Sequence, residues 1–420
     1  MRKFGAVAAV AVALAAVGAT SASAGGLSAA DSGILGVNSP DRIAGRYIVV
    51  LDDNARTSVA ATRAEHTAGV TVTDVYRSAI NGYSASMTQA DAERLAQAPG
   101  VQSVQVDERV EATVQSMPTG INRANADASP TAAINGTDTR VDVDVAVIDT
   151  GVDLDHPDLN VFSEGGQNCS LLGLSPDDQN GHGSHVAGTI GALDNTTGVV
   201  GMAPGARIWP VRVLNAAGVG STSDVICGID YVTANADQIE VANMSLGGQG
   251  TDDGNCGQTN GDAQHQAICE SVAAGVTYVV AAGNSAADSA TTTPAAYDEV
   301  ITVSALADFN GQPGGGAAST CRADADDSFA DFSNFGQDVD LIAPGTCIRS
   351  TYMNGGYSTL SGTSMASPHA AGGAALYLAT HPNATPVAVK SALQDAGTLD
   401  WNGADDLDST QERLLDASSF

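Results

Sequence analysis

The chain has 420 residues, of which 43% are hydrophobic, so it is long enough for two or three domains with a large core. Its formal net charge is −31, from 48 Asp and Glu residues against 17 Lys and Arg residues. This charge repels a polyanion and no basic patch interrupts it, so we expect no nucleic-acid partner. Aromatic residues make up only 4% while Gly and Ala abound, which favours tightly packed helices on a sheet.

The first residues have the pattern of a secretory signal peptide. Arg2 and Lys3 precede an apolar run from Phe4 to Gly18, and Ala22-Ser-Ala24 fits a cleavage site after residue 24. The alternative of a membrane anchor is disfavoured because the apolar run is short for crossing a bilayer. No later segment is suited to spanning a membrane. We therefore expect a secreted, extracellular protein with no membrane attachment once residues 1–24 are removed.

The next part of the chain predicts a small α+β domain with a folded core at residues 45–111. Strands are expected at 46–51, 70–76, 80–87 and 101–106, and helices at 54–67 and 88–98, the second capped by Thr88. This β-α-β-β-α-β order is that of a ferredoxin-like fold. Residues 1–113 hold 9 of the 17 basic residues but only 11 of the 48 acidic ones, which supports a domain boundary near this point.

The remainder of the chain alternates strands and helices. Strands are expected to end at 148 and to lie at 207–213, 241–244, 277–281 and 300–305, with helices after His182 and Ser364 and at 221–235 and 263–274. Such alternation predicts an α/β fold, with a mainly parallel sheet covered by helices on both faces. Functional residues in such folds gather at the carboxyl edge of the sheet.

Three motifs in this part carry residues of one kind of chemistry. Val145-Ala-Val-Ile-Asp-Thr-Gly151 brings Asp149 to the end of an apolar strand. Asn180-Gly-His-Gly-Ser-His185 and Ser361-Gly-Thr-Ser-Met-Ala366 place His182 and Ser364 at the starts of helices rich in small residues. A serine hydroxyl becomes a nucleophile when an imidazole removes its proton and an acid orients that imidazole. Taken alone, Ser364 would equally suit an N-cap, but the three motifs together predict catalytic Asp149, His182 and Ser364.

The order Asp, His, Ser in these motifs resembles the subtilase family of serine peptidases, in both its subtilisin and proteinase K branches. The resemblance extends from about Gln115 to the end of the chain and implies a subtilisin-like serine endopeptidase. It also implies that Val280-Ala-Ala-Gly-Asn284 supplies Asn284 as an oxyanion donor beside the Ser364 N–H. A simple turn is the alternative interpretation of this Gly-Asn pair.

The small N-terminal domain resembles the subtilase propeptide, most clearly at Ile80-Asn-Gly-Tyr-Ser-Ala85. The resemblance implies an intramolecular chaperone that is also a temporary inhibitor. It places cleavage near the Thr113–Val114 bond, which gives a propeptide of residues 25–113 and a peptidase domain of residues 114–420. A binding module that is never removed is the alternative.

The resemblance further implies that protein and peptide substrates bind in extended form between two edge segments. These segments are Gly218-Val219-Gly220 and Ser245-Leu246-Gly247-Gly248, with Ala281-Ala282-Gly283 completing the pocket for the residue before the cut. Their side chains are small or apolar, so we expect a preference for apolar and aromatic residues at that position. Asp288 lies near in sequence, which leaves open a convertase-type protease that cuts after basic residues.

A structural Ca²⁺ ion also follows from the resemblance. Its ligands would be Gln115, Asp158, Leu193, Asn195, Thr197 and Val199, through side-chain oxygens and loop carbonyls. Hard oxygen ligands of this kind suit Ca²⁺. Thr197 replaces an apolar residue of the family, which changes nothing if only its carbonyl binds. A glycine-tipped turn without an ion is the alternative.

Six cysteines lie after the expected cleavage site, and an even number in a secreted chain predicts three disulfides. Fifteen pairings of six cysteines exist. Cys256–Cys269 and Cys321–Cys347 are each local in sequence, which leaves Cys169–Cys227. A metal site formed by these cysteines is disfavoured because no C-x-x-C pair occurs.

A catalytically silent, secreted binding protein is an alternative from another functional class. Such a protein would have little reason to keep Asp149, His182, Asn284 and Ser364 together. We therefore expect an active enzyme, monomeric, whose partners are its substrates and its own propeptide.

Overall fold

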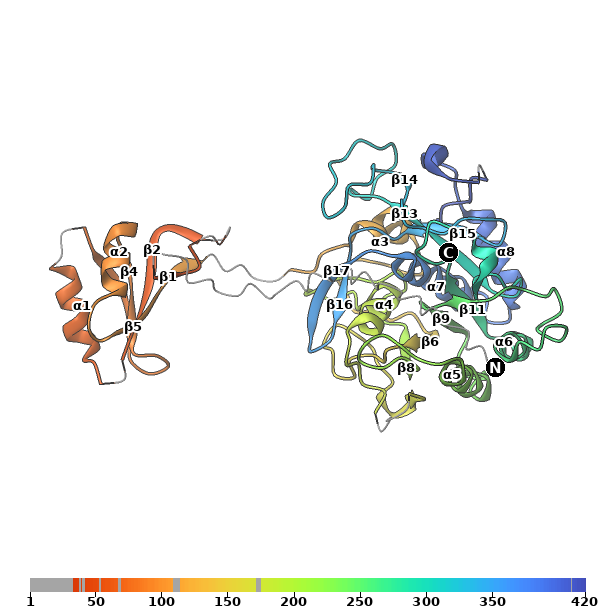
Figure 1. The fold of residues 1–420 in the computed structure, drawn as a ribbon, viewed down its shortest axis with the longest axis horizontal. Helices are drawn as coiled ribbons and strands as arrows, with labels where there is room; N and C mark the ends of the chain where they lie inside the picture. Colours follow the sequence, from red (N-terminus) through yellow and green to blue (C-terminus); the bar gives the residue numbers. More distant parts are fainter. Residues whose placement is uncertain are drawn as a thin grey trace, which may run out of the picture. The chain divides into compact units, whose positions relative to one another are not determined.

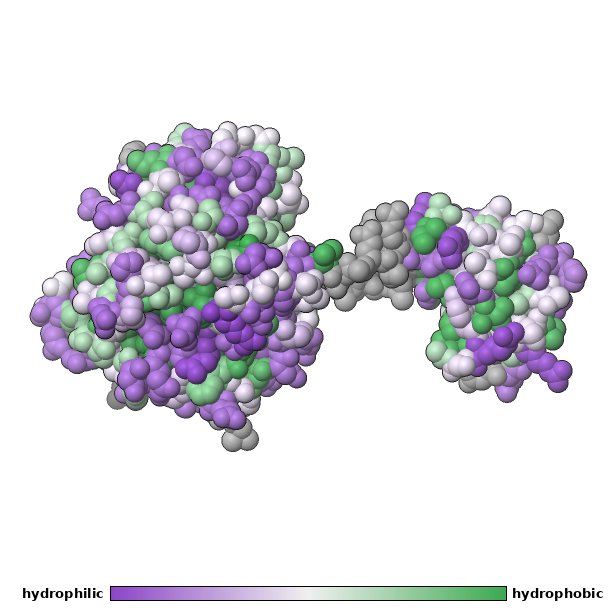
Figure 2. Space-filling view, turned by 180° about the vertical axis from the view of Figure 1, so that it is seen from behind, coloured by the Kyte–Doolittle hydropathy of each residue, from purple (hydrophilic) through white to green (hydrophobic). Residues whose placement is uncertain are grey.

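The computed structural model describes residues 33–37, 39, 42–52, 54–66, 69–108, 114–170, 175–408 and 410–420. The expected signal peptide and the residues just before the expected maturation cut, 110–113, lie outside these ranges. The chain divides into two compact units, Met1–Ala112 and Thr113–Phe420 (Figure 1). Among the described residues, no helix combines the length and apolarity needed to cross a bilayer. Hydrophilic residues cover much of the face seen in Figure 2, with smaller hydrophobic patches between them.

The smaller unit is a five-stranded sheet packed against two helices around one core. Its elements are β1 (Ile34–Leu35), β2 (Arg42–Leu51), α1 (Thr57–Glu65), β3 (Thr71–Tyr76), β4 (Gly82–Ser86), α2 (Gln89–Ala96) and β5 (Val101–Glu108). From β2 onward this is the predicted ferredoxin-like order. The Thr88 hydroxyl caps α2 by accepting the Asp91 N–H at 3.2 Å. The two-residue β1, which pairs in parallel with β5, was not predicted because it is too short to show a pattern.

The larger unit is organised around an eight-stranded sheet. Its strands are β6 (Asp144–Asp149), β7 (Gln167–Asn168), β8 (Arg207–Arg212), β9 (Val241–Met244), β11 (Thr277–Ala281), β13 (Ile301–Ala307), β14 (Ser328–Phe329) and β15 (Leu341–Pro344). They run in the order β14-β13-β11-β9-β6-β8-β7, and β15 also pairs with β13. Every pair is parallel except β13–β14, which confirms the predicted mainly parallel sheet.

Helices cover both faces of this sheet (Figure 1). Along β6, Val145 and Val147 belong to a core shared with α4, α7 and α8, whereas Ala146 and Ile148 belong to a core shared with α5 and α6. The side chains of a strand alternate between its faces, so a strand that is apolar throughout must be covered on both. The helices are α3 (Thr119–Arg123), α4 (His182–Gly191), α5 (Thr222–Ala234), α6 (Ala263–Ala273), α7 (Thr363–Thr380) and α8 (Pro386–Ala396).

Smaller elements complete the unit. Two hydrogen-bonded pairs, β10 (Gly248–Gln249) with β12 (Thr292–Thr293) and β16 (Ile348–Tyr352) with β17 (Gly356–Leu360), are antiparallel. Short 3-10 helices in the described part of this unit are η1 (Ala126–Ala128), η2 (Ser163–Gly165), η3 (Ser289–Thr291) and η4 (Gly403–Asp405). Disulfides join the three pairs expected from the sequence: Cys169–Cys227, Cys256–Cys269 and Cys321–Cys347.

Several elements of the larger unit were not predicted from the sequence, among them α3, β7, β14, β15, α8 and the β16–β17 hairpin. Helix α8 begins with Thr385 as its N-cap and Pro386 at its first position, and Gly397 follows it. These are ordinary start and stop signals and would have predicted the helix. The β16–β17 hairpin has a weaker signal, because its strands are rich in Ser, Thr and Gly.

Candidate active site

Asp149 is the last residue of β6, and its side chain is fully buried. Its Oδ1 accepts the Thr150 N–H at 2.6 Å and lies 2.8 Å from Nδ1 of His182, which is also 3.0 Å from Oδ2. An ionised carboxylate only accepts hydrogen bonds, so Nδ1 of His182 carries the proton of this contact. Nε2 then has a free lone pair and is able to act as a base.

The loop before α4 is held by the buried carboxylate of Asp178. Oδ1 accepts the N–H groups of Asn180 and Gly181, both at 2.9 Å. Oδ2 accepts the Ser184 N–H at 3.0 Å and its hydroxyl at 2.6 Å. One acid therefore fixes both sides of His182, which is the first residue of α4.

Helix α4 approaches the end of β6 very closely. A Cβ atom at Gly183 would lie 2.0 Å from the carbonyl oxygen of Gly151 and 3.2 Å from Cβ of Asp149. No side chain fits in that space, so glycine at this position allows the imidazole of His182 to reach Asp149.

The environment of His182 has opposing effects on its pKa. Burial lowers the pKa, but the negative charge of Asp149, the hydrogen bond to it and the charge of Asp178 outweigh this, so the net pKa is raised above that of a free imidazole. The His182 side chain is 27% exposed, so its free edge is accessible.

Ser364 is the second residue of α7, directly after the turn at Gly362. Its hydroxyl donates to the Ser245 carbonyl at 3.3 Å, and its carbonyl accepts the Ser245 hydroxyl at 2.8 Å. The first N–H groups of a helix have no intrahelical acceptor, so they are free to bind an anion. Helix α7 packs against α4, which joins the Ser364 and His182 segments through the core.

The carboxamide of Asn284 lies beside the same turn. Its Oδ1 accepts the Thr363 N–H at 2.8 Å and the Thr363 hydroxyl at 3.0 Å. A Cβ atom on Gly362 would lie 3.5 Å from Nδ2 of Asn284. Thr363 thus fixes the orientation of the amide and leaves both Nδ2 hydrogens available next to Ser364.

Two neighbouring cavities, of about 430 and 460 Å³, flank these residues. The first is lined by His182 and the second by Asn284 and Ser364, and residues 246–249 form a wall common to both. Of the expected substrate segments, Gly218, Val219, Gly220 and Ser245 line the first cavity, Ala281 and Gly283 line the second, and Leu246, Gly247 and Gly248 line both. The sites expected from separate parts of the sequence therefore lie together.

Ala282 does not line either cavity and departs from the expectation. It is fully buried, its N–H donates to the Val303 carbonyl at 3.0 Å, and its carbonyl accepts from Asn334 at 3.0 Å. The alternation of side chains along an extended segment directs Ala282 away from the cavity that its two neighbours line.

The other histidines of helices α4 and α7 have structural contacts. Nε2 of His185 lies 2.9 Å from the Ile348 carbonyl, and Nδ1 of His369 lies 2.8 Å from the Met365 carbonyl. Burial lowers their pKa values to about 3 and about 4, respectively. Both rings are therefore neutral and packed inside the protein.

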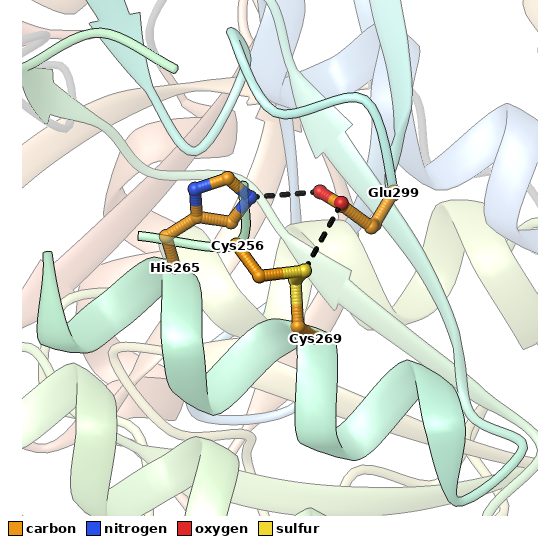
Figure 3. A group of neighbouring side chains, drawn as sticks. All are labelled: Cys256, His265, Cys269 and Glu299. Atoms are coloured by element: carbon orange, nitrogen blue, oxygen red, sulfur yellow. Dashed lines mark hydrogen bonds and ion pairs between the residues drawn. A yellow bond between two sulfur atoms is a disulfide. The ribbon is translucent and has the colours of Figure 1, made fainter. Parts of the chain in front are cut away.

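A second cluster of polar groups surrounds His265 on α6 (Figure 3). Nε2 of His265 lies 2.8 Å from Oε2 of Glu299, close to Cys256 and Cys269. These two cysteines form a disulfide, so neither has a thiolate to offer a metal ion. Nδ1 lies 3.8 Å from Asp253, whose two oxygens already accept four backbone N–H groups. The cluster therefore anchors the segment before α6.

The residues expected to bind calcium also lie together. Asp158 accepts the Val199 N–H at 2.9 Å and the amide of Asn195 at 2.7 Å. The Gln115 N–H donates to the Thr196 carbonyl at 3.1 Å, which brings Gln115 to the same loop. Oε1 of Gln115 is buried and has no hydrogen-bond partner among the described residues.

Comparisons with known proteins show which family this chain belongs to. The model of the subtilase family matches residues 141–412, and that of peptidase inhibitor I9 matches residues 46–113. This chain belongs to the subtilase family. It is a subtilisin-type serine protease with an inhibitor I9 domain at its N-terminal end.

Individual relatives support the same family assignment. The extracellular serine proteinase of Thermus sp. (strain Rt41A) is 37% identical over 392 residues, covering 86% of this chain and 87% of that protein. Subtilisin NAT of Bacillus subtilis subsp. natto is 36% identical over 323 residues, or 76% of each chain. The crystal structure of a cold adapted subtilisin-like serine proteinase matches with a TM-score of 0.56 at 35% identity, covering 71% of this chain and 97% of that one.

Several residues that position the subtilase site were not singled out from the sequence. Asp178 and Thr363 orient His182 and Asn284, respectively. Asp178 stands four residues before His182 and just before a Gly-containing turn, a pattern typical of an acid that accepts backbone N–H groups. Thr363 lies inside the serine motif, but nothing local indicates that it contacts a residue 79 positions away.

The raised pKa of His182 predicts the pH dependence of activity. Protonated imidazole cannot accept the proton of Ser364, so kcat/KM should rise with pH and reach half its plateau above about 6.5, the value for free imidazole. Asp178→Asn should move this midpoint to lower pH because it removes one negative charge near His182. Initial rates of hydrolysis of a neutral peptide between pH 5 and 9 measure the midpoints of the wild type and of the variant. Asp155→Asn, an exposed change, is the control. A profile that is flat from pH 5 to 9 would contradict the role of His182.

Proposed function

We propose that Asp149, His182 and Ser364 form the catalytic triad of this protease. The observation that carries the proposal is the contact of 2.8 Å between buried Asp149 and His182, at the cavity next to the one lined by Ser364. Nε2 of His182 takes the hydroxyl proton as Ser364 attacks the peptide carbonyl, and then gives that proton to the leaving amine. A water molecule then attacks the acyl group on Ser364. His182 takes a proton from this water and gives it back to the Ser364 oxygen as the acyl group is released. The Ser364 hydroxyl first has to exchange the Ser245 carbonyl for His182.

Asn284 is proposed to bind the oxyanion of the tetrahedral intermediate. Thr363 holds Oδ1 and so orients the amide, while no described group accepts a hydrogen bond from Nδ2. The Ser364 N–H at the start of α7 is the second donor. Donors fixed in advance stabilise the charge as it develops without reorganising. Losing one such donor raises the barrier by about 3–4 kcal/mol.

Substrates are proposed to bind in extended form along residues 218–220 and 245–248. The side chain before the cut would enter the cavity of about 460 Å³. Its lining is uncharged: Leu246, Gly247, Gly248, Gln249, Ala281, Gly283, Asn284, Ser285, Ala287, Thr291, Thr292, Asn334, Thr363 and Ser364. Asp288, which suggested the convertase alternative, is absent from that lining, and its carboxylate accepts the Ala290 N–H at 3.0 Å. An apolar or aromatic residue before the cut therefore fits best.

The chain is proposed to be secreted as a zymogen. Residues 1–24 would be removed as a signal peptide, residues 25–113 would be an inhibitory propeptide, and residues 114–420 would be the mature enzyme. Support comes from the I9 match, which ends at residue 113, and from the extracellular relative of Thermus. The enzyme is proposed to act as a monomer on protein and peptide substrates.

A structural Ca²⁺ ion is proposed to bind beside Asp158. The donor set fits an ion that prefers oxygen, because Gln115 has a buried oxygen without a partner. The carbonyls of Thr196 and Gly198 accept backbone N–H groups, whereas no described N–H donates to those of Leu193, Thr197 and Val199. The expected ligands Gln115, Asp158, Leu193, Asn195, Thr197 and Val199 would hold the ion, which would fix the N-terminal end of the mature chain to the loop.

Ser364→Ala tests the proposed triad. The variant should lose almost all peptide hydrolysis and should accumulate as an unprocessed chain when expressed alone, since the nucleophile is required for both reactions. Mass spectrometry of the product and activity assays measure the two effects. Ser418→Ala, which changes an exposed serine outside both cavities, should mature and cleave normally. Normal processing of Ser364→Ala would contradict self-maturation.

Ala287→Asp tests the proposed specificity. The wild-type enzyme should cleave a peptide library mainly after Phe, Tyr, Leu and Met, because the lining of the second cavity is uncharged. A carboxylate introduced at Ala287 should shift cleavage toward Lys and Arg, by an ion pair of about 1–3 kcal/mol in a partly buried setting. The ratio of kcat/KM for Phe and Arg substrates measures the shift. A wild-type enzyme that prefers basic residues would favour the convertase alternative.

Removing calcium tests the proposed ion. A chelator should lower the unfolding temperature of the inhibited enzyme by about 5 °C, because an ion at 100 times its Kd contributes about 2.7 kcal/mol. Asp158→Asn should remove most of this dependence. Asp155→Asn, an exposed acid in the same segment, should keep it. Equal chelator effects in the Asp158→Asn variant and the wild type would place the ion elsewhere.

A further inference from the structure

The first of the two active-site cavities, of about 430 Å³, contains a buried polar side chain without a partner. Gln264, the second residue of α6, lines this cavity and is only 8% exposed. Its backbone N–H donates to the Asp262 carboxylate at 3.0 Å, but its carboxamide makes no hydrogen bond to any described residue. Neither polar atom of the carboxamide is sealed inside the protein. The carboxamide therefore opens into the cavity with its donors and its acceptor unused.

The other polar groups of this cavity are already satisfied or lie at its rim. The buried polar side chains that have hydrogen-bond partners within the protein are Thr150, Ser245 and Thr293. Gln249, a second glutamine of the lining, is exposed to solvent. No Asp, Glu, Lys or Arg side chain of the described chain lines the cavity. A molecule that fills it thus meets a neutral wall in which the buried carboxamide of Gln264 needs a partner.

The carboxamide is presented from a rigid support, because the first turn of α6 is fixed. Oδ1 of Asp262 caps the helix, and Oδ2 accepts the Tyr297 hydroxyl at 2.6 Å. The next residue, His265, is fully buried and stacks on Tyr297 with ring centroids 3.9 Å apart. Its Nε2 lies 2.8 Å from Glu299 (Figure 3). A group held in this way loses little freedom when it binds a ligand.

An unpaired amide in a cavity discriminates between ligands. A ligand side chain that enters displaces the water that would solvate such an amide, and an apolar side chain does not replace the lost hydrogen bonds. A site with a hydrogen-bonding group rejects an analogue without the matching group more strongly than an apolar site rejects a change of size. A carboxamide of the ligand matches Gln264 best, because the two groups can exchange two hydrogen bonds, each donating one and accepting one.

We propose that Gln264 determines the specificity of the protease at a second substrate position, by selecting an Asn or Gln side chain that enters the first cavity. The inference rests on the proposed function, in which residues 218–220 and 245–248 hold the extended substrate before the cut. Residues of both segments line the first cavity, whereas the residue directly before the cut enters the second. The side chain that pairs with Gln264 therefore belongs to a residue further toward the N-terminus of the substrate.

Pairs of peptides test the inference on the processed protease. All have Phe before the cut, and the two members of a pair differ only by Gln or Met at one of the three preceding positions. At one position the wild-type kcat/KM should be about tenfold higher for Gln, because Met leaves the amide unpaired. Gln264→Met keeps the length of the side chain but removes its hydrogen bonds. This variant should lose the preference for Gln and should still cleave the Met peptide.

Gln266→Met is the matched control. Gln266 lies on the same helix outside both cavities, and its amide donates to the Gly257 carbonyl at 3.0 Å. The control variant loses an internal hydrogen bond of α6 but should keep the wild-type ratio of kcat/KM for each pair. If Gln264→Met fails to fold, Gln264→Leu should show the same loss of preference.

The outcomes separate this inference from the proposed function. A wild-type enzyme that cleaves the Gln and Met peptides equally at all three positions would overturn the role of Gln264, while cleavage after Phe would still support the proposed substrate site. A preference for Gln that persists in the Gln264→Met variant would also overturn it, because another group would then bind the carboxamide. Failure to cleave any of the peptides would refute the proposed substrate site, and the inference with it.

Discussion

The fully buried carboxylate of Asp149 is the constraint on which the active-site region depends. A charge that is removed from water needs close hydrogen-bond donors, and here they are the Thr150 N–H and His182. His182 reaches Asp149 only because α4 lies against the end of β6 at Gly183. The far end of α4 is as close to β16, where a Cβ atom on Gly188 would lie 2.1 Å from Oγ1 of Thr351. Glycine at these two positions of α4 thus permits the close packing that brings His182 to Asp149.

Most carboxylates of this chain cannot pair with Lys or Arg, because these basic residues are too few. The structure stabilises the carboxylates by other contacts. Some acids accept several backbone N–H groups, as Asp178 and Asp253 do. A few pair with the rare cations, such as Asp340 with Lys390 at 2.8 Å and Asp327 with Arg123 at 2.8 Å. Others are buried beside donors from neighbouring segments, as Asp158 is beside the Val199 N–H and the Asn195 amide.

The second cavity of the candidate active site avoids this negative charge. Although the chain has a net charge of −31, the residues around the second cavity are neutral. Asp288 caps η3 with its carboxylate. Because no charged side chain lines this cavity, its shape and the desolvation of a bound group, and not ion pairing, would govern what binds in it.

Much of this protein was predictable from the sequence because the relevant signals are local. The apolar runs, the glycines beside Asp149, His182 and Ser364, and the alternation of strands and helices all depend on neighbouring residues, and they predicted a mainly parallel sheet covered by helices on both faces. The order of the three motifs also allowed the subtilase fold and the candidate site to be predicted together.

Only the tertiary structure decided how distant side chains meet. Thr363 fixes the amide of Asn284 across 79 positions, and Ala282 faces the sheet although both its neighbours line a cavity. The acids that follow Trp401 carry no local sign of burial, yet packing buries Asp406 and Glu412. Burial and mutual distance depend on how separate elements pack, and a pattern of neighbouring residues contains no record of that packing.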